Sequence, residues 1–399
     1  MNFSDKLGSM DFLKFLMHSQ QLTNWRSTGG PELMYIVLSH ESCDLDSVAS
    51  TLAIAYLHFR NRGIFKHKIL PVLNMLRCDY ASKTEVKFLL EKRSINAETH
   101  LVFRDDVPGD LLQCSRFILV NHHVSPFHYC SEEVYDYRPY QCEAARLPIY
   151  CQRIMHPMRS CAAIVTERYL SRIYNSSNVQ CLFVFELLHA ALLLQNNFFE
   201  YTLEQLSEMR DFHMLLYLEK QLGILDMPKR TILRDTLVRA MFNLDELTLP
   251  QILRREFKLM CAKNENYFVR IAHCCFPMAV TRFISYEFAE QALRELGAEN
   301  KLNFIMLLGT STQQKGGLGI KEIGIIPLDA LRAVGDRRLF DHLIINLNAA
   351  DQPLLSLEPY RGLDFMRGAF FIIDECNIKF YDILSLMQRI IYDFISKTI

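Results

Sequence analysis

The sequence lacks an excess of charge of either sign. It carries 44 lysine and arginine residues against 45 aspartate and glutamate residues, which gives a formal net charge of −1. A general nucleic-acid-binding protein shows a basic excess, so this balance argues against that class of protein. A local basic pocket for a phosphate ester is still compatible with it.

The sequence also lacks any Cys-x-x-Cys pair, although it contains twelve cysteines. This argues against a zinc ribbon and against a thioredoxin-type redox motif. Many of the cysteines lie inside apolar runs. We therefore expect reduced, buried thiols in a protein of a reducing compartment.

Long apolar runs are missing as well, and we expect no leader sequence in residues 1–26. The most hydrophobic stretch, Cys181–Leu194, contains Glu186 and His189 and is too short to span a bilayer. We expect it to be a buried helix in which His189 is a hydrogen-bonded core histidine rather than a ligand. Residues 1–26 resemble neither a signal peptide nor a transit peptide. The prediction is a cytoplasmic protein that binds neither nucleic acid nor membrane, and a mitochondrial isoform is the alternative.

Strand-like and helix-like segments alternate in the first half of the chain, and residues 164–225 are mostly helical in pattern. Alternation of this kind indicates βαβ units and a parallel sheet with helices on both faces. The predicted strands are 35–39, 68–74, 100–104 and 116–120, and the predicted helices between them are 47–59 and 82–91.

A charged, proline-bearing break at Asp226–Arg230 is the best candidate for a domain boundary. We predict an α/β domain over residues 1–225 and a smaller α+β domain over residues 226–399. His273–Cys275 is either a small ligand cluster or, as we prefer, the face of a buried helix, and Gly316–Gly319 is a hairpin turn. The second domain should contain helices at 231–242, 249–262 and 381–395 and strands at 303–310 and 320–326.

The most informative motif is His-Glu-Ser-Cys-Asp-Leu-Asp-Ser at residues 40–47, which follows an apolar run. One imidazole and two carboxylates, from His40, Asp44 and Asp46, therefore leave the carboxyl end of a strand on one short loop. Open α/β sheets bind ligands at this edge, and divalent cations prefer such side chains. The alternative is that Asp46 or Ser47 only caps the following helix.

Further polar side chains follow two other predicted strands. Asp105 comes after the strand at 100–104, and Asn121-His122-His123 comes after the strand at 116–120. Since the carboxyl ends of parallel strands collect at one edge, these side chains should lie beside residues 40–47. The residues therefore predict a metal centre at that edge of the sheet.

The spacing His-x3-Asp-x-Asp resembles motif I of the DHH phosphoesterase superfamily. The segments that follow come in the order and at the intervals typical of its Prune and exopolyphosphatase branch, which is close to the family II pyrophosphatases. This resemblance implies a parallel-sheet DHH domain and a smaller DHHA2-like domain that closes over the site. The segments that carry it are Pro71–Asn74, Leu101–Asp106, Phe117–His123, Asp136–Pro139 and Ser160–Arg168.

The resemblance also implies a hydrolase with two ions of Mn²⁺ or Mg²⁺. The implied ligands are His40, Asp44 and Asp105 for one ion, and Asp46, Asp105 and His122 for the other. The implied catalytic residues are Asp44, Asp105, His123 and Arg138. The implied substrate-binding residues are His123, Arg138 and Lys379.

The chain departs from the branch at several of these positions. Asn121 replaces the first residue of the Asp-His-His signature, and Gln195 stands where a further metal-binding aspartate is expected. Ile378 and Phe380 replace cations of a phosphate-binding segment in which Lys379 keeps its charge. The loss of an anionic ligand should leave one tight ion and one weakened ion.

Two functional hypotheses follow from these residues and from the resemblance. The first is a phosphohydrolase of weak or altered activity toward short-chain polyphosphate, pyrophosphate or a cyclic nucleotide phosphodiester. The second is a catalytically impaired regulatory protein that binds a nucleoside diphosphate kinase. Asn121 and Gln195 are the residues that separate the two hypotheses.

Overall fold

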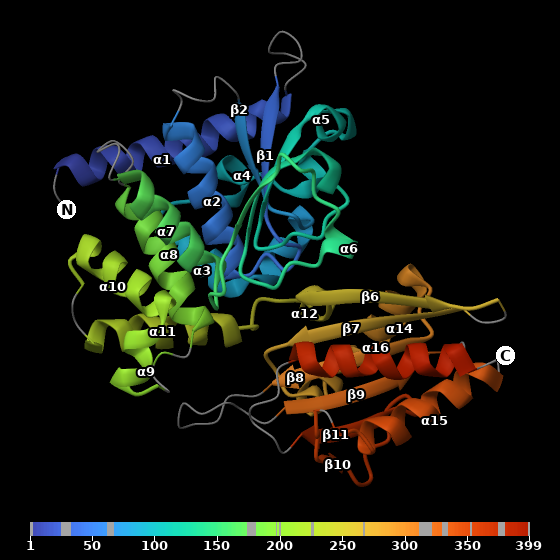
Figure 1. Ribbon diagram of the computed structural model, residues 1–399. Coiled ribbons are helices and arrows are strands. Elements are labelled where there is room, and N and C mark those ends of the chain that lie inside the picture. The colour runs from blue at the N-terminus through green and yellow to red at the C-terminus, as the bar shows by residue number, and fades with distance from the viewer. Residues whose placement is uncertain are drawn as a thin grey trace. The chain divides into compact units, whose positions relative to one another are not determined.

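The computed structural model divides the chain into two units, Met1–Asn243 and Leu244–Ile399 (Figure 1). Ile378, Lys379 and the predicted turn at Gly316–Gly319 lie outside the described residues, and nothing is described of the Phe380 side chain. The structure describes all residues except 1–2, 25–32, 62–67, 174–180, 197, 199–200, 225–226, 266–267, 311–320, 329–333, 352, 374–379 and 398–399.

Unit 1 is built on a five-stranded parallel sheet with the strand order β2-β1-β3-β4-β5. Helices cover both faces of a parallel sheet, so its strands are apolar runs. All of β1 is buried, as this requires. The predicted strands at 35–39, 68–74 and 116–120 are confirmed. The strands are β1 (Met34–Leu38), β2 (Lys68–Val72), β3 (Arg116–Val120), β4 (Ser131–Asp136) and β5 (Gln152–Met155).

The predicted strand at 100–104 is wrong. Only Phe103 pairs there, through one parallel bridge to Leu73. The side chain of Asn96 accepts the N–H of Glu98 at 2.7 Å and caps a short helix, so the chain coils where a strand was expected. The elements on either side of the bridge are α4 (Ala97–His100) and the 3₁₀ helix η3 (Arg104–Asp106).

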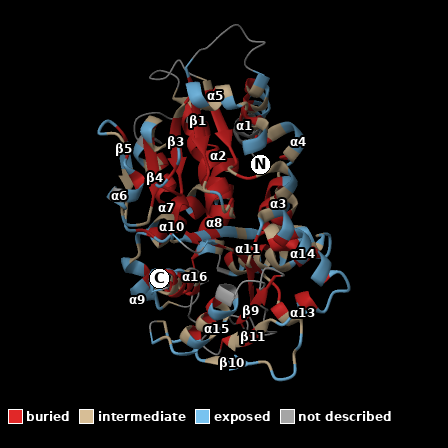
Figure 2. Cartoon of the chain, turned by 90° about the vertical axis from the view of Figure 1, so that its right-hand side faces the viewer, coloured by how far each residue is buried: buried red, intermediate tan, exposed pale blue. Residues whose placement is uncertain are grey.

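Helices cover both faces of the sheet, as predicted (Figure 1). Helices α1, α2 and α7 contact the strands on one face, and α8 packs behind them on α2 and α7. Leu111 of α5 packs on the other face. Figure 2 shows the buried residues concentrated in the strands and in these inner helices. The helices are α1 (Phe3–Gln21), α2 (Leu45–Arg60), α5 (Gly109–Cys114), α7 (Cys161–Ile173) and α8 (Leu182–Gln195).

The stretch 181–194 is a buried helix, as predicted. His189 is 1% exposed and its Nε2 lies 3.3 Å from Oε1 of Glu219, which confirms it as a hydrogen-bonded core histidine. The remaining helices of unit 1 are η2 (Arg77–Ser82), α3 (Thr84–Glu91), η4 (His128–Cys130), α6 (Cys142–Ala145), α9 (Leu203–Glu208), α10 (Arg210–Leu222) and α11 (Met227–Phe242).

Unit 1 extends beyond the boundary that the sequence suggested. Helix α11 packs on α3 and α8 and therefore belongs to the first unit, which ends at Asn243. Pro228 lies in the first turn of α11, where its missing N–H would have no partner within the helix in any case. The proline that suggested a break thus starts a helix.

Unit 2 is an α+β unit with a six-stranded mixed sheet, as predicted, in the order β10-β11-β9-β8-β7-β6. Only β7 and β8 run parallel to each other among its paired strands. The predicted strands at 303–310 and 320–326 and the C-terminal helix at 381–395 are confirmed. The strands are β6 (Glu256–Lys263), β7 (Phe268–Phe276), β8 (Phe304–Thr310), β9 (Lys321–Pro327), β10 (Leu357–Pro359) and β11 (Ala369–Ile373).

Two predictions for unit 2 are wrong. The expected helix at 249–262 ends at Arg254, because the residues after it pair with β7 along their whole length as β6. His273–Cys275 lies in strand β7, where Cys274 and Cys275 pack in opposite cores because successive side chains of a strand alternate. The helices are α12 (Leu249–Arg254), α13 (Val280–Ile284), α14 (Ala289–Asn300), α15 (Val334–Asn348) and α16 (Phe380–Lys397).

The described cysteines are free thiols. No helix in the described part of the chain combines the length and the apolar character needed to cross a membrane.

A buried acidic residue on β4 should make unit 1 sensitive to acid. The carboxylate of Glu133 lies 3.2 Å from Nε2 of His58 and accepts the hydroxyl of Tyr135 at 2.6 Å. Burial alone would raise the pKa of Glu133, but these hydrogen bonds lower it to about 2 from an ordinary value of 4.5. A carboxyl group whose pKa is lower in the folded than in the unfolded state stabilises the fold at pH values above its unfolded pKa. This stabilisation is lost as the pH falls toward the folded pKa.

We therefore expect Glu133 to contribute up to about 3 kcal/mol at neutral pH, lost between roughly pH 4.5 and pH 2. Urea unfolding at a series of pH values, for the unmodified protein and for Glu133→Gln, measures this. The variant should be less stable at pH 7, and the difference between the two proteins should shrink with acid. A difference that stays constant with pH would contradict the assignment.

Candidate metal centre

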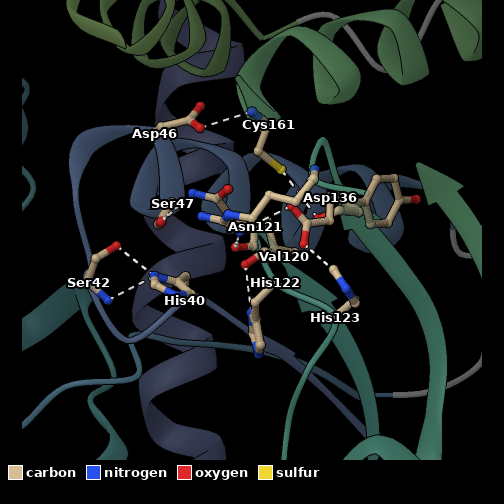
Figure 3. Close-up of polar contacts among 12 residues, drawn as sticks. His40, Ser42, Asp46, Ser47, Val120, Asn121, His122, His123, Asp136 and Cys161 are labelled. Carbon is tan, nitrogen blue, oxygen red and sulfur yellow. Dashed lines mark hydrogen bonds and ion pairs between the residues drawn. The ribbon is translucent and has the colours of Figure 1, made fainter. Parts of the chain in front are cut away.

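The predicted site lies at the topological switch point of the parallel sheet. Strand β1 stands between β2 and β3. The chain continues from β1 to β2 on one side of β1 and then crosses to β3 on the other side. In such folds, ligands bind at the carboxyl ends of the two strands between which the strand order reverses. Residues 40–47 follow β1, and residues 121–123 follow β3. The ring centres of His40 and His122 are 5.9 Å apart, and Figure 3 shows these residues gathered beside α2.

Asp44 caps the helix that begins in the 40–47 loop. Its Oδ1 accepts the N–H of Ser47 at 2.8 Å, so the capping residue is Asp44 and not Asp46 or Ser47, as the alternative interpretation had it. Burial raises the pKa of Asp44, but the hydrogen bond from Ser47 and the charge of His40 outweigh it and leave the pKa below its ordinary value. Asp44 is therefore an anion that both caps a helix and faces the site.

The hydrogen bonds of Ser42 hold the imidazole of His40 in place. The backbone N–H of Ser42 donates to Nδ1 of His40 at 3.1 Å. The Ser42 hydroxyl lies 2.8 Å from the same nitrogen and donates to Oδ2 of Asp44 at 3.0 Å (Figure 3). Ser42 therefore orients His40 and contacts the neighbouring carboxylate of Asp44.

The tautomer of His122 is determined by a backbone contact. Its Nδ1 donates to the carbonyl oxygen of Val120 at 3.0 Å, and its buried Nε2 has no hydrogen-bond partner within the described structure. Burial lowers the pKa of His122 to about 4, so the imidazole is neutral at pH 7. A buried, neutral imidazole with an unused lone pair is what a metal ligand requires.

Asp46 is held by the amino end of a second helix. It is 2% exposed, and its two oxygens accept the N–H groups of Cys161 and Ala162 of α7 at 2.9 and 2.8 Å. The partial positive charge at the start of a helix stabilises such an anion. Burial and the neighbouring charge of Asp44 nevertheless raise the pKa of Asp46 to about 7. A nearby cation would favour its ionised form.

Asn121 adopts a left-handed backbone conformation with φ of 62°, which asparagine tolerates better than most residues. Its Nδ2 donates to Oγ of Ser47 at 2.7 Å and so joins the β3 loop to the start of α2. Its Oδ1 is buried and has no hydrogen-bond partner in the part of the chain that the structure describes. The amide thus fits the space of the expected aspartate but brings no charge to it.

His123 and Arg138 are organised around the buried carboxylate of Asp136. His123 donates from Nδ1 to Oδ2 of Asp136 at 2.6 Å and accepts the N–H of Gln141 on Nε2 at 3.1 Å. Arg138 donates to Oδ1 of Asp136 at 3.1 Å and to the carbonyl oxygen of Asn121 at 2.7 Å. Both ring nitrogens of His123 are thus engaged by the protein, whereas the Arg138 side chain is 36% exposed. A phosphate contact of either residue stays a prediction.

Asp105 is exposed and lies in η3, which begins directly after the bridge between Phe103 and Leu73. One of its oxygens accepts the N–H of Arg77 at 2.9 Å, while the Arg77 side chain forms two bonds to Asp106. Among the described residues, no three histidine, cysteine, aspartate or glutamate side chains are placed as a ready metal site. The structure brings the 40–47 loop and His122 together, and the place of Asp105 in the site stays a prediction.

Gln195 is the last residue of α8 and is exposed, and α8 packs on α2, α7 and α10. Its identification as a lost ligand stays a prediction. Two contributors to the site escaped the sequence analysis, namely Ser42 and the amino end of α7. A serine directly before a helix is a capping signal, and Ser160 accepts the N–H of Ala163 at 3.3 Å, so this signal could have located the second contributor.

Comparison with known proteins finds relatives in sequence and in fold, although no protein-family model matches the chain. Exopolyphosphatase PRUNE1 of Bos taurus is 31% identical over 234 residues, which cover 56% of this chain and 49% of that protein. The Homo sapiens protein of the same name is 30% identical over 260 residues, which cover 63% of this chain and 54% of that protein. The chain thus spans about half the length of the curated relatives it matches.

A solved structure matches both units. The putative family II inorganic pyrophosphatase of Methanococcus jannaschii aligns with a TM-score of 0.54 and 16% identity, over 90% of this chain and 100% of that chain. At this identity the match shows the fold, and it confirms the predicted parallel-sheet domain followed by an α+β domain. The sequence relatives and the fold agree with the motifs, so the chain is similar in sequence to the PRUNE1 exopolyphosphatases and in fold to a family II pyrophosphatase.

Proposed function

We propose that the chain is a metal-dependent phosphohydrolase acting on short-chain polyphosphate, pyrophosphate or a cyclic nucleotide phosphodiester. The observation that carries the proposal is the buried Nε2 of His122, which has no hydrogen-bond partner among the described residues, at the switch point where the ring centre of His40 lies 5.9 Å away. Asp44 and Asp46 accompany them on the same short loop. The relatives named exopolyphosphatases and the pyrophosphatase-like fold support the same chemistry.

The donors suit a hard or borderline divalent ion such as Mn²⁺ or Mg²⁺. The buried Nε2 of His122 has no partner within the described residues, and Asp46 is a buried carboxylate that a cation would keep ionised. His40, Asp44, Asp46 and His122 would hold the ion, and Asp105 is the remaining candidate ligand. When bound, it would supply a Lewis acid for phosphoryl oxygens and an activated water.

The substrate side of the site is provided by groups that stabilise negative charge. Arg138 is fixed by Asp136 and by the carbonyl oxygen of Asn121, so its guanidinium is oriented before a substrate arrives. His123 holds Asp136 in place and thereby supports Arg138. Lys379 of the second unit would add a further cation. This set favours a compact, highly charged phosphate substrate.

A test is phosphate release from pyrophosphate and tripolyphosphate, and ring opening of cyclic AMP, each with Mn²⁺. We expect slow, Mn²⁺-dependent turnover of at least one of them, because the neutral Asn121 and Gln195 weaken a second ion. The double variant Asn121→Asp, Gln195→Asp should bind the weaker Mn²⁺ about tenfold more tightly and turn over faster.

Each outcome of this assay separates the possibilities. No turnover above background in either protein would reject the hydrolase. Faster turnover in the double variant would confirm that the missing carboxylates limit the reaction. If the double variant binds Mn²⁺ more tightly but turns over at the same rate, the phosphate-binding cations limit the reaction instead.

The second candidate is a regulatory protein that binds a nucleoside diphosphate kinase. It is favoured by the neutral residues Asn121 and Gln195 and by the fact that no ready set of three metal-binding side chains is found among the described residues. Kinase binding that persists in Asp44→Asn, with no turnover in any variant, would select this function over the first.

A further inference from the structure

The amino end of α7 is held by a second buried carboxylate in addition to Asp46. Asp211, in the first turn of α10, accepts the N–H of Arg159 on both of its oxygens, at 3.1 and 3.2 Å. It also accepts the hydroxyl of Ser160 at 3.2 Å. That same hydroxyl oxygen accepts the N–H of Ala163, so Asp211 anchors both the turn before α7 and the cap of α7.

The two carboxylates divide the N–H groups of this helix end between them. Asp211 takes the N–H of Arg159, and Asp46 takes those of Cys161 and Ala162. Asp46, Ser160 and Asp211 are 2%, 0% and 3% exposed, so water has little access to any of these bonds. A displacement of residues 159–160 would therefore be transmitted directly to the two N–H groups that orient Asp46.

We propose that Asp211 is a positioning residue for Asp46 and acts through the amino end of α7. The inference rests on the proposed function, because it treats Asp46 as a metal ligand. In Asp211→Asn, an NH2 group would replace one of the two oxygens that face the Arg159 N–H, and two donors facing each other in a buried place cost about 1–3 kcal/mol and favour a shifted turn. Metal ligands have to be held within about 0.5 Å of their productive positions, so such a shift should reach ion binding.

The test is a Mn²⁺ titration of the full chain by calorimetry and electron paramagnetic resonance, for the unmodified protein and for Asp211→Asn. We expect Mn²⁺ to bind roughly tenfold more weakly in the variant, the range seen when supporting groups of metal ligands are removed. In an Asp46→Asn background, Asp211→Asn should have no further effect on Mn²⁺ affinity, since its influence passes through Asp46.

The matched control is Glu322→Gln in the second unit. Glu322 is 5% exposed and accepts the N–H and the hydroxyl of Thr281 at the start of α13, so it makes the same kinds of bond as Asp211. Its replacement should destabilise the protein to a similar degree but leave Mn²⁺ affinity unchanged. An equal loss of affinity in both variants would reduce the role of Asp211 to general stability and overturn the proposal.

Failure of the positioning role and failure of the proposed function can be told apart. If Asp46→Asn does not weaken Mn²⁺ binding, the metal centre itself is wrong. If Asp46→Asn weakens it and Asp211→Asn does not, only the positioning role is wrong. Should Asp211→Asn fail to fold, Ser160→Ala removes one of the bonds to Asp211 and should weaken Mn²⁺ binding in the same direction by a smaller factor. Unchanged affinity in Ser160→Ala would then overturn the proposal.

Discussion

Replacement of Asp44 by asparagine should lower Mn²⁺-dependent phosphate release at least about 100-fold, because the variant loses an ionised ligand. Asp44 has two roles, and this substitution separates them. Asparagine caps helices about as well as aspartate, so the N–H of Ser47 keeps its acceptor. The thermal midpoint of unfolding should therefore change little while turnover and Mn²⁺ affinity fall together.

Two companion variants check this separation. Asp44→Ala loses the cap and the ligand, so it should be inactive and also less stable by about 1 kcal/mol. Glu41→Gln neutralises an exposed carboxylate of the same loop and should change neither property. Full turnover in Asp44→Asn would show that Asp44 is only a helix cap and would remove the first ligand from the proposed site.

The largest expected effect on stability is at the buried ion pair of Glu219 and Arg230. Arg230 donates from Nε and Nη2 to the two carboxylate oxygens of Glu219, at 2.7 and 2.5 Å, and joins α11 to α10. His189 of α8 approaches the same carboxylate. Replacing Glu219 by alanine strands the buried charge of Arg230, which should reduce the free energy of unfolding by about 3–5 kcal/mol in urea titrations.

A chemically matched control is the exposed pair Glu290 and Arg294 on α14. Glu290→Ala should cost no more than about 0.5 kcal/mol, since solvent screens such a pair. The double variant Glu219→Leu, Arg230→Met should recover most of the loss, because no charge then remains buried without a partner. A loss in Glu219→Ala as small as that in Glu290→Ala would mean that water reaches Arg230 when its partner is gone.

The sequence was most informative where one physical signal dominated. Short apolar runs identified β1, β2 and β3, because strands buried on both faces need them. Strands β4 and β5 were missed since Ser131, Glu132 and Glu133 or Gln152 and Arg153 begin them, and polar residues at the start of a strand give no apolar run. Strand β6 was taken for a helix because it follows α12 directly in the chain. Its pairing with β7 cannot be seen in its own residues.

The site shows a similar division. Strand ends predicted that residues 40–47 and the triplet Asn121-His122-His123 would meet, and they do. The strand expected at 100–104 is instead a helix, a single bridge and a 3₁₀ turn, and the place of Asp105 beside them stays a prediction. The contacts of Ser42, Ser160 and Asp211 depend on side-chain directions and on packing between helices, which spacing along the chain does not encode.

The position of α11 determines how this protein can be cut into parts. A fragment that stopped at the proline-bearing segment near residue 228 would keep His189 but omit Arg230, and the buried carboxylate of Glu219 would lose its arginine. It would also uncover the surfaces of α3 and α8 that α11 contacts. Crystallography, display or two-hybrid work with the first unit alone should therefore use a piece that runs through Asn243.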